Sequence, residues 1–236
     1  MSTLRTDRLL ERIEGLTAQR DDEPGLAVSV IRGVDVIARR HVGLASLAHR
    51  VPIGPRTRFH IVSVSKTFMA AAVLVLAARG ALRLDDDVRR HLPELPPEVS
   101  PGGALTIRHL LSMTSGLHDV LEIERLRGVW DTAPSRTRDL LDLVRRISGV
   151  SGLPGAQYMY GNVNVLLLDE LVARVSGMPA EAFRRAVLYE PLGLVDTAAR
   201  AARGPRGPRS RRALCAGRRG RVVARHPASS ASRPIR

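Results

Sequence analysis

The chain has 236 residues, of which 44% are hydrophobic, 25% are charged and only 3% are aromatic. This length allows one or two domains with cores built mainly from aliphatic side chains. The single cysteine, Cys215, excludes an intrachain disulfide and a metal site made of several thiolates. The charged N-terminus lacks an apolar signal core, and the longest apolar run, residues 68–78, is too short to cross a bilayer. Unless a leader is missing, these features predict a cytoplasmic protein without a membrane span.

The net charge of +14 is concentrated at the end of the chain. Residues 197–236 hold 12 arginines and no acidic residue, whereas residues 1–196 hold 25 basic and 23 acidic residues. The tail is composed almost wholly of Ala, Arg, Gly, Pro and Ser, which predicts disorder. Three interpretations stay open: a tail that binds nucleic acid or anionic lipid, a solvated linker, or a shifted reading frame, which the abrupt change favours. The near-neutral body disfavours nucleic acid as a partner.

The first 58 residues are predicted to form a helix and two strands. Residues 6–19 carry Leu and Ile at helical spacing and precede an Asp-Asp-Glu-Pro-Gly sequence that ends the helix. Residues 26–31 and 36–44 are predicted to pair as a hairpin with its turn at Gly33. Because a two-stranded hairpin is marginally stable alone, we expect other elements to pack on it.

The second predicted region, residues 59–196, is mostly helical, and the tail 197–236 is the third. A long apolar helix is predicted to begin at Ser63 and to end at residue 78, with Gly80 as its C-cap. Apolar periodicity and capping residues predict further helices at residues 84–93, 106–113, 135–147, 162–175 and 179–189.

Ser63 and Lys66, the only lysine of the chain, form an S-x-x-K pattern at the start of the long apolar helix. Residues three apart on a helix share one face, so the Lys66 amine is expected to lie over the Ser63 hydroxyl. An amine whose pKa is lowered by burial can take the serine proton, and a helix N-terminus stabilises an oxyanion. A capping serine with a solvated lysine would give the same pattern, but a lone lysine on so apolar a helix favours catalysis.

The second candidate motif is Tyr160-Gly161-Asn162, which follows a Gly-rich loop. A phenol beside an ammonium shifts toward phenolate and can carry a proton, and an asparagine amide can bind both a substrate carbonyl and a lysine. Taken alone, the motif fits a loop tyrosine and a helix-capping asparagine at least as well. His60 and His118 are expected to be structural or exposed. The sequence holds no motif for a metal or cofactor, and none is predicted.

Five segments, in the right order along the chain, resemble the serine beta-lactamase and penicillin-binding-protein superfamily, and the resemblance covers about residues 8 to 197. The closest likeness is to its class C beta-lactamase-related branch. The segments are Phe59 to Phe68 with S-x-x-K, Gly-Ala-Leu-Arg-Leu-Asp-Asp at 80–86, Leu-Thr-Ile-Arg-His-Leu-Leu-Ser-Met-Thr-Ser-Gly-Leu at 105–117, Pro154-Gly155 to Tyr160-Gly161-Asn162, and Pro-Leu-Gly-Leu at 191–194. In the third segment, Met113 stands where a histidine is common.

This resemblance implies an α+β fold of the beta-lactamase/transpeptidase type, here a mostly helical region with an incomplete antiparallel sheet. It implies hydrolysis of a small ester, lactam or D-amino-acid amide through a Ser63 acyl-enzyme. Lys66 and Tyr160 would share proton transfer, and Asn162 would help to hold the substrate.

The third motif of the family, Lys-x-Gly or His-x-Gly on a downstream strand, has no match after residue 162. Arg218-Arg219-Gly220 has a similar shape but no strand pattern around it, and the later strands of the family are missing too. We therefore expect a truncated or frame-shifted member of the family. Two alternatives to hydrolysis stay open. One is an inactive fragment or pseudoenzyme of the same fold that at most binds a ligand, and the other is a protein that binds nucleic acid through the basic tail.

Overall fold

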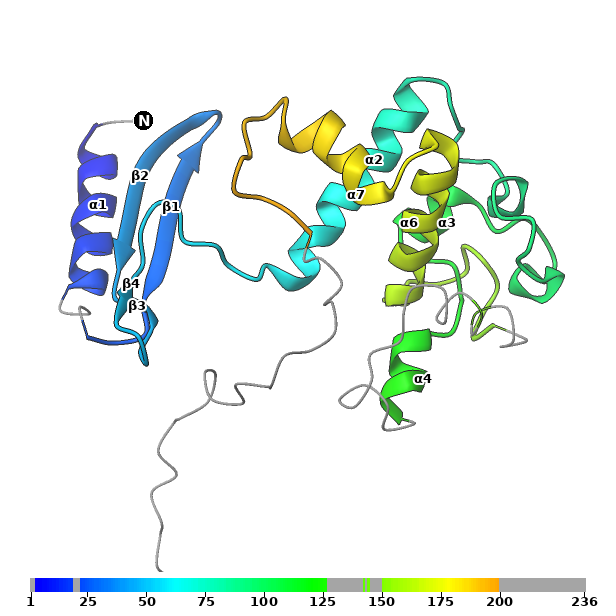
Figure 1. Ribbon diagram of the computed structural model, residues 1–236, viewed down its shortest axis with the longest axis horizontal. Coiled ribbons are helices and arrows are strands. Elements are labelled where there is room, and N and C mark those ends of the chain that lie inside the picture. The colour runs from blue at the N-terminus through cyan, green and yellow to red at the C-terminus, as the bar shows by residue number, and fades with distance from the viewer. Residues whose placement is uncertain (1–2, 19–21, 127–141, 143, 145–149, 200–236) are drawn as a thin grey trace, which may run out of the picture. The chain divides into compact units, whose positions relative to one another are not determined.

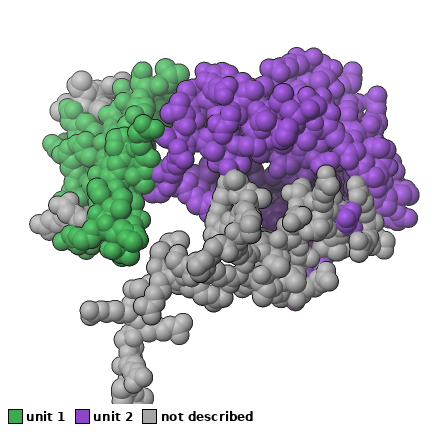
Figure 2. All heavy atoms as spheres, viewed as in Figure 1, with its two compact units in different colours: residues 1–57, 202–236 green, residues 58–201 purple. Residues whose placement is uncertain are grey.

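The computed structural model describes residues 3–18, 22–126, 142, 144 and 150–199. The chain divides into two compact units, each described here by itself (Figures 1 and 2). Unit 1 holds the described residues up to Thr57, and unit 2 holds those from Arg58 on. Most of the predicted helix at residues 135–147 and nearly all of the predicted tail lie outside the described residues. The three interpretations of the tail therefore stay predictions.

Unit 1 consists of one helix and two small antiparallel sheets (Figure 1). Its elements are α1 (Thr3–Thr17), β1 (Leu26–Arg32), β2 (Asp35–Val42), β3 (Leu44–Ser46) and β4 (Val51–Pro52). Strand β1 pairs with β2, β3 pairs with β4, and α1 contacts β2. The predicted helix and hairpin are confirmed. The second strand was predicted to run to residue 44, which is wrong, because Gly43 with a φ of 71° divides it into β2 and β3.

Unit 2 is helical and is arranged around one central helix, α6. Its longer elements are α2 (Lys66–Ala78), α3 (Ile107–Leu111), α4 (Val120–Leu126), α6 (Asn162–Ser176) and α7 (Ala180–Arg184). Helix α6 contacts each of the other four. Short turns of tighter or wider helix, η1 (Val62–Ser65), η2 (Val88–Arg90), η3 (Pro97–Val99) and η4 (Arg185–Tyr189), complete the unit. The helices predicted at residues 106–113, 162–175 and 179–189 are confirmed, whereas the one at 84–93 is only the turn η2, and α4 was not predicted.

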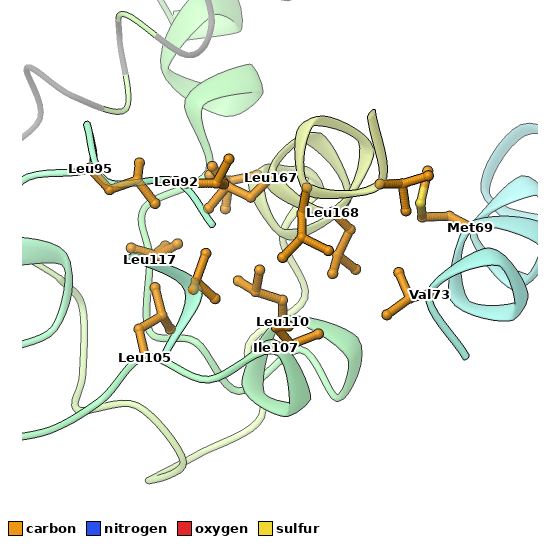
Figure 3. Close-up of a cluster of buried hydrophobic side chains, with 14 of the residues drawn as sticks. Met69, Val73, Leu92, Leu95, Leu105, Ile107, Leu110, Leu117, Leu167 and Leu168 are labelled. Atoms are coloured by element: carbon orange, nitrogen blue, oxygen red, sulfur yellow. The ribbon is translucent and has the colours of Figure 1, made fainter. Parts of the chain in front are cut away.

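The core of unit 2 is aliphatic, as the composition predicts. Leu168 of α6 lies between Met69 and Val73 on one side and the α3 side chains Ile107 and Leu110 on the other, and Leu167 lies beside Leu92 (Figure 3). Leu167 has no exposed surface. Burying one such side chain stabilises a fold by roughly 1.5–3 kcal/mol relative to leaving it in water. Tight packing around α6 therefore fixes the helices that carry the functional side chains.

Helix α2 ends at the glycine that was predicted as its C-cap, although Arg79 holds the C-cap position and Gly80 follows it. Gly80 has a φ of 72°, its N–H donates to the Ala77 carbonyl at 3.0 Å, and the N–H of Ala81 donates to the Leu76 carbonyl at 3.0 Å. This pair of hydrogen bonds defines a Schellman motif, in which a residue without a Cβ is favoured at the left-handed position. The position of α2 is thus set at its far end by backbone bonds and along its length by the core.

The described residues combine a mostly helical unit with two small antiparallel sheets, so the α+β class is confirmed. Among these residues, no helix has both the length and the apolar character needed to cross a membrane.

Candidate active site

Ser63 lies in a sharp turn just before α2. It belongs to the 3-10 turn η1, and α2 itself begins at Lys66, three residues later than predicted. Val62 has a φ of 47°, a left-handed conformation that β-branched residues rarely adopt. The turn is closed by the Val64 N–H, which donates to the Ile61 carbonyl at 3.0 Å, and by the Ser65 hydroxyl, which donates to the Val62 carbonyl at 2.6 Å. A strained turn of this kind presents Ser63 to solvent, and such strain gathers at functional sites.

Two functional groups meet at the Ser63 hydroxyl. The Lys66 ammonium donates a hydrogen bond to Ser63 Oγ at 3.1 Å, and the Tyr160 hydroxyl donates to the same oxygen at 2.9 Å. Tyr160 lies 97 residues further along the chain, so the fold, and not local sequence, creates this contact. Lys66 Nζ also lies 5.1 Å from the centre of the Tyr160 ring. Two groups that can carry a proton therefore flank one hydroxyl.

The Tyr160 phenol is the titratable group that this arrangement changes. The hydrogen bond with Lys66, and after it the one with Ser63, lowers the pKa of Tyr160 below the ordinary value of 10.0. Partial burial and the negative charge of Asp119 oppose this change. A positive charge that stabilises the phenolate increases the fraction of Tyr160 that is deprotonated, and so able to accept a proton, at a given pH.

Asn162 links the two motifs. It is the first residue of α6, and its Oδ1 accepts a hydrogen bond from Lys66 Nζ at 2.9 Å. The interpretation of Asn162 as a helix cap is wrong, because Gly161 holds the cap position and no side chain caps the helix. The amide is instead engaged with Lys66, as the catalytic interpretation requires.

Asp119 is a site residue that the sequence analysis missed. Its Oδ2 accepts two hydrogen bonds from Asn162, one from the backbone N–H at 2.9 Å and one from Nδ2 at 3.0 Å. Its Oδ1 accepts from the Leu121 N–H at 3.1 Å, at the start of α4. An Asp before a helix is a readable capping signal. The contact with Asn162, 43 residues away, has no signal in one sequence.

Two loops join in a short ladder that carries Tyr160 to the site. The three backbone bonds run from Ser151 N to Gly116 O at 2.8 Å, from Gly155 N to Thr114 O at 2.8 Å, and from Met159 N to Met113 O at 2.7 Å. Gly116 has a φ of 72°, and a Cβ there would lie 2.0 Å from the Gly152 carbonyl oxygen. Only glycine allows the loops to approach so closely. The ladder ends at Met159, directly before Tyr160.

The two histidines near the motifs take no part in these contacts. His60 is exposed, and His118 Nδ1 lies 2.9 Å from the Ser151 hydroxyl. Across the described part of the chain, no three His, Cys, Asp or Glu side chains gather in a way that could hold a metal ion. The four predicted site residues, Ser63, Lys66, Tyr160 and Asn162, are therefore brought together, and their catalytic roles stay a prediction.

Comparison with known proteins gives this arrangement a family. A family model described as Beta-lactamase matches residues 11–232. Esterase EstB of Burkholderia gladioli is 37% identical over 182 residues, which are 73% of this chain and 46% of the esterase. The matched part of this chain thus spans less than half of that relative's length.

Solved structures agree with the sequence relatives. The hydrolase EstCE1, described as having promiscuous acyltransferase activity, is 26% identical with a TM-score of 0.70, over 81% of this chain and 53% of EstCE1. The octameric penicillin-binding-protein homologue from Pyrococcus abyssi is 26% identical with a TM-score of 0.65, over 83% of this chain and 44% of that protein. The predicted beta-lactamase/transpeptidase-like fold is confirmed, and the chain belongs to the serine beta-lactamase and penicillin-binding-protein superfamily.

Proposed function

We propose that this chain is a serine hydrolase in which Ser63 forms an acyl-enzyme with a small ester, lactam or D-amino-acid amide. One observation carries the proposal. The Ser63 hydroxyl oxygen lies within hydrogen-bond distance of both Tyr160 and Lys66, 2.9 and 3.1 Å away, on an exposed turn that a substrate can reach. A serine hydroxyl needs such a base beside it to act as a nucleophile.

In the proposed first step, Ser63 Oγ bonds to the carbonyl carbon while its proton passes to the Tyr160 phenolate or to the Lys66 amine. The carbonyl π electrons move onto oxygen and give an oxyanion. When the oxyanion collapses, the bond to the alcohol or amine breaks, and that leaving group takes the proton. Water then attacks the Ser63 ester with the same base, releases the acid and restores the serine.

The proposed role of Asn162 is to hold Lys66 and the substrate. Its Oδ1 accepts from Lys66 at 2.9 Å, which keeps the ammonium beside Tyr160 and Ser63. The presence of an esterase and a hydrolase among the similar proteins supports acyl transfer for this chain. The exposed setting of Ser63 sets no narrow limit on the acyl group, so the proposal covers esters, lactams and amides alike. Assignment to the class C-related branch stays a prediction.

The experiment is a search for an acyl adduct on the full chain. The protein is mixed with p-nitrophenyl acetate and, separately, with a chromogenic β-lactam, and the release of product is followed with the intact mass and the peptide map. We expect a mass increase on the peptide that holds Ser63. Lys66→Ala should slow its formation about 10²- to 10⁴-fold, which is the usual contribution of a general base.

Two serine variants separate specific from adventitious acylation. Ser63→Ala should abolish the adduct. Ser29→Ala is the matched control, because Ser29 is also exposed but lies in β1 of unit 1 and takes no part in the turn that presents Ser63. Its adduct should form at the wild-type rate. An adduct that persists in Ser63→Ala, or no adduct with either reagent, would contradict the proposed function.

A second candidate is a site that is acylated but barely turns over. It is favoured by the lack of a Lys-x-Gly or His-x-Gly after residue 162, since the loss of one oxyanion donor costs about 10² to 10³ in turnover. Stable accumulation of the Ser63 adduct without continued product release would support this candidate over the hydrolase.

A further inference from the structure

The carboxylate of Asp119 makes contacts that a helix cap does not require. One oxygen, Oδ1, accepts from the N–H of Leu121 at 3.1 Å, which is the ordinary contact of a cap at the start of α4. The other oxygen, Oδ2, accepts twice from Asn162, through the backbone N–H at 2.9 Å and through Nδ2 at 3.0 Å. The second oxygen thus binds the first residue of a different helix, α6.

These contacts decide which way the Asn162 amide faces. An asparagine side chain presents a donor on one side and an acceptor on the other, and rotation by half a turn exchanges them. With Asp119 on one side, only the NH₂ group can face the carboxylate, because a carbonyl oxygen there would be repelled. The carbonyl oxygen must then face the other side, where it accepts from Lys66 Nζ at 2.9 Å.

We propose that Asp119 is a positioning residue of the acyl-transfer site, which orients the Asn162 amide so that its oxygen holds Lys66 beside Ser63. Asp119 touches no reacting atom, so it acts only through Asn162. The inference rests on the proposed function, because it assigns a role to the order of these side chains in the reaction of Ser63. The resulting chain of contacts runs from Asp119 to Asn162, then to Lys66, and then to the nucleophile.

The expected effect follows from the mobility of a lysine side chain. Lys66 is only half-buried, and without a fixed acceptor its ammonium is free to turn toward water. A misplacement of about 1 Å at a reacting centre can cost about 100-fold in rate. Loss of the Asp119 carboxylate should therefore slow Ser63 acylation by about 10- to 100-fold.

The variant Asp119→Ser separates positioning from capping. Serine caps a helix about as well as aspartate, so α4 keeps its cap and the chain its fold, but the second oxygen is lost. We expect the chain to stay folded, with a thermal midpoint lowered by the loss of the two hydrogen bonds from Asn162, while acylation by p-nitrophenyl acetate slows. Asp87→Ser is the matched control, because Asp87 also caps a turn, through the N–H of Arg89, outside the site. It should acylate at the wild-type rate.

The pKa of Tyr160 distinguishes a positioning role of Asp119 from a capping role. The hydrogen bond with Lys66 is the largest cause of the lowered pKa of Tyr160, the one with Ser63 is the next, and the negative charge of Asp119 acts in the opposite direction. If Asp119→Ser releases Lys66, the Tyr160 pKa rises. If Lys66 stays in place, removal of the negative charge lowers that pKa. The absorbance of the phenolate in alkaline titration, with Tyr160→Phe subtracted, distinguishes the two directions.

A higher Tyr160 pKa in Asp119→Ser supports the positioning role, and an unchanged or lower one overturns it, whatever the acylation rate. In an Asn162→Ala background, Asp119→Ser should not raise the Tyr160 pKa, since the intermediate residue is gone and only the loss of the negative charge, which lowers that pKa, remains. A rise there as large as in the wild-type background would also overturn the inference. Because the titration needs no substrate, it tests Asp119 even if Ser63 is never acylated. Failure of the proposed function is then seen separately, as a wild-type chain without adduct.

Discussion

The two units of the chain bury their side chains to very different degrees. In unit 1 the least exposed residues, such as Thr17 and Ile13, keep 7–9% of their surface, and Leu16 of α1 is 68% exposed. In unit 2 many aliphatic residues around α6, such as Leu105, Ile107 and Leu167, have no exposed surface at all. Each sheet of unit 1 has only two strands, and sheets of that size are marginally stable alone.

The difference in burial indicates which unit can stabilise an exposed and strained site. Ser63 lies on a turn whose preceding residue, Val62, is in an unfavourable conformation, and a turn of this kind costs of order 1–3 kcal/mol. All five residues of the proposed site belong to unit 2, whose core holds α2 and α6 in place. The four predictions below test this contrast.

The largest effect is expected from the centre of the unit 2 core. Leu167→Ala removes a side chain with no exposed surface and should lower the free energy of unfolding by about 2–5 kcal/mol. Leu16→Ala in α1 removes a leucine that is mostly in water and should change it by less than about 0.5 kcal/mol. Urea denaturation followed by circular dichroism measures both. Equal losses in the two variants would mean that the contrast in burial does not govern stability.

A second prediction concerns the loop ladder that carries Tyr160. Gly116 and Gly80 share a φ of 72°, but a Cβ at Gly116 would meet the Gly152 oxygen at 2.0 Å, whereas at Gly80 the space is open. Both alanine variants incur the left-handed backbone cost, and only Gly116→Ala adds overpacking, about 1–3 kcal/mol more. Thermal unfolding of the two variants isolates this difference. Equal midpoints would show that the loops can move apart without loss of stability.

Met113→His should give a smaller, stabilising change. Met113 has a φ of 57°, which histidine tolerates better than methionine. Its sulfur lies 3.3 Å from Asn164 Nδ2, and Asn164 Oδ1 is buried without a hydrogen-bond partner among the described residues. An imidazole in this space can bond the amide and should add about 0.5–1.5 kcal/mol to the free energy of unfolding. Met178→His, at a partly exposed position, should be neutral, and a destabilised Met113→His would contradict the prediction.

Local signals in the sequence predicted much of the architecture. The apolar spacing of α6 and the glycine after α2 identified both helices, because these features depend on residues close together in the chain. The break between β2 and β3 at Gly43 was missed, because the left-handed conformation of that glycine is seen only in the structure. Helix α4 was missed because it is short, with Glu122 and Arg125 breaking its apolar pattern. Its cap Asp119 was the available signal.

Four of the five residues of the site were predictable, and its geometry was not. The resemblance to a family named Ser63, Lys66, Tyr160 and Asn162, but a sequence does not show distances between residues 97 positions apart. The start of α2 was predicted at Ser63, because helix propensity cannot reveal that Val62 adopts a left-handed conformation. Asp119 was missed because its contact with Asn162 depends on the packing of α4 against α6, which the sequence does not show.

The smallest predicted effect is a dependence of stability on pH that reports on unit 2 alone, because all three tyrosines, at positions 158, 160 and 189, lie in it. Lys66 lowers the pKa of Tyr160 in the folded chain. The contribution of Tyr160 to the free energy of unfolding is therefore fully present above pH 10.0, the unfolded value, and is lost as the pH falls through the folded pKa. Burial raises the pKa of Tyr189 in the folded chain. Its contribution to the free energy of unfolding is therefore fully present below pH 10.0, the unfolded value, and is lost as the pH rises through the folded pKa.

Urea denaturation of wild type and Tyr160→Phe, compared from neutral pH to pH 10, measures the first contribution. The stability of the wild type should rise relative to Tyr160→Phe as the pH approaches 10. Above pH 10 the wild type must ionise a buried phenol, so its free energy of unfolding should fall relative to that of Tyr189→Phe. A wild-type curve parallel to that of Tyr160→Phe over the whole range would mean that Lys66 does not stabilise the phenolate. The contrast between an exposed site and a buried core would then have no electrostatic consequence within unit 2.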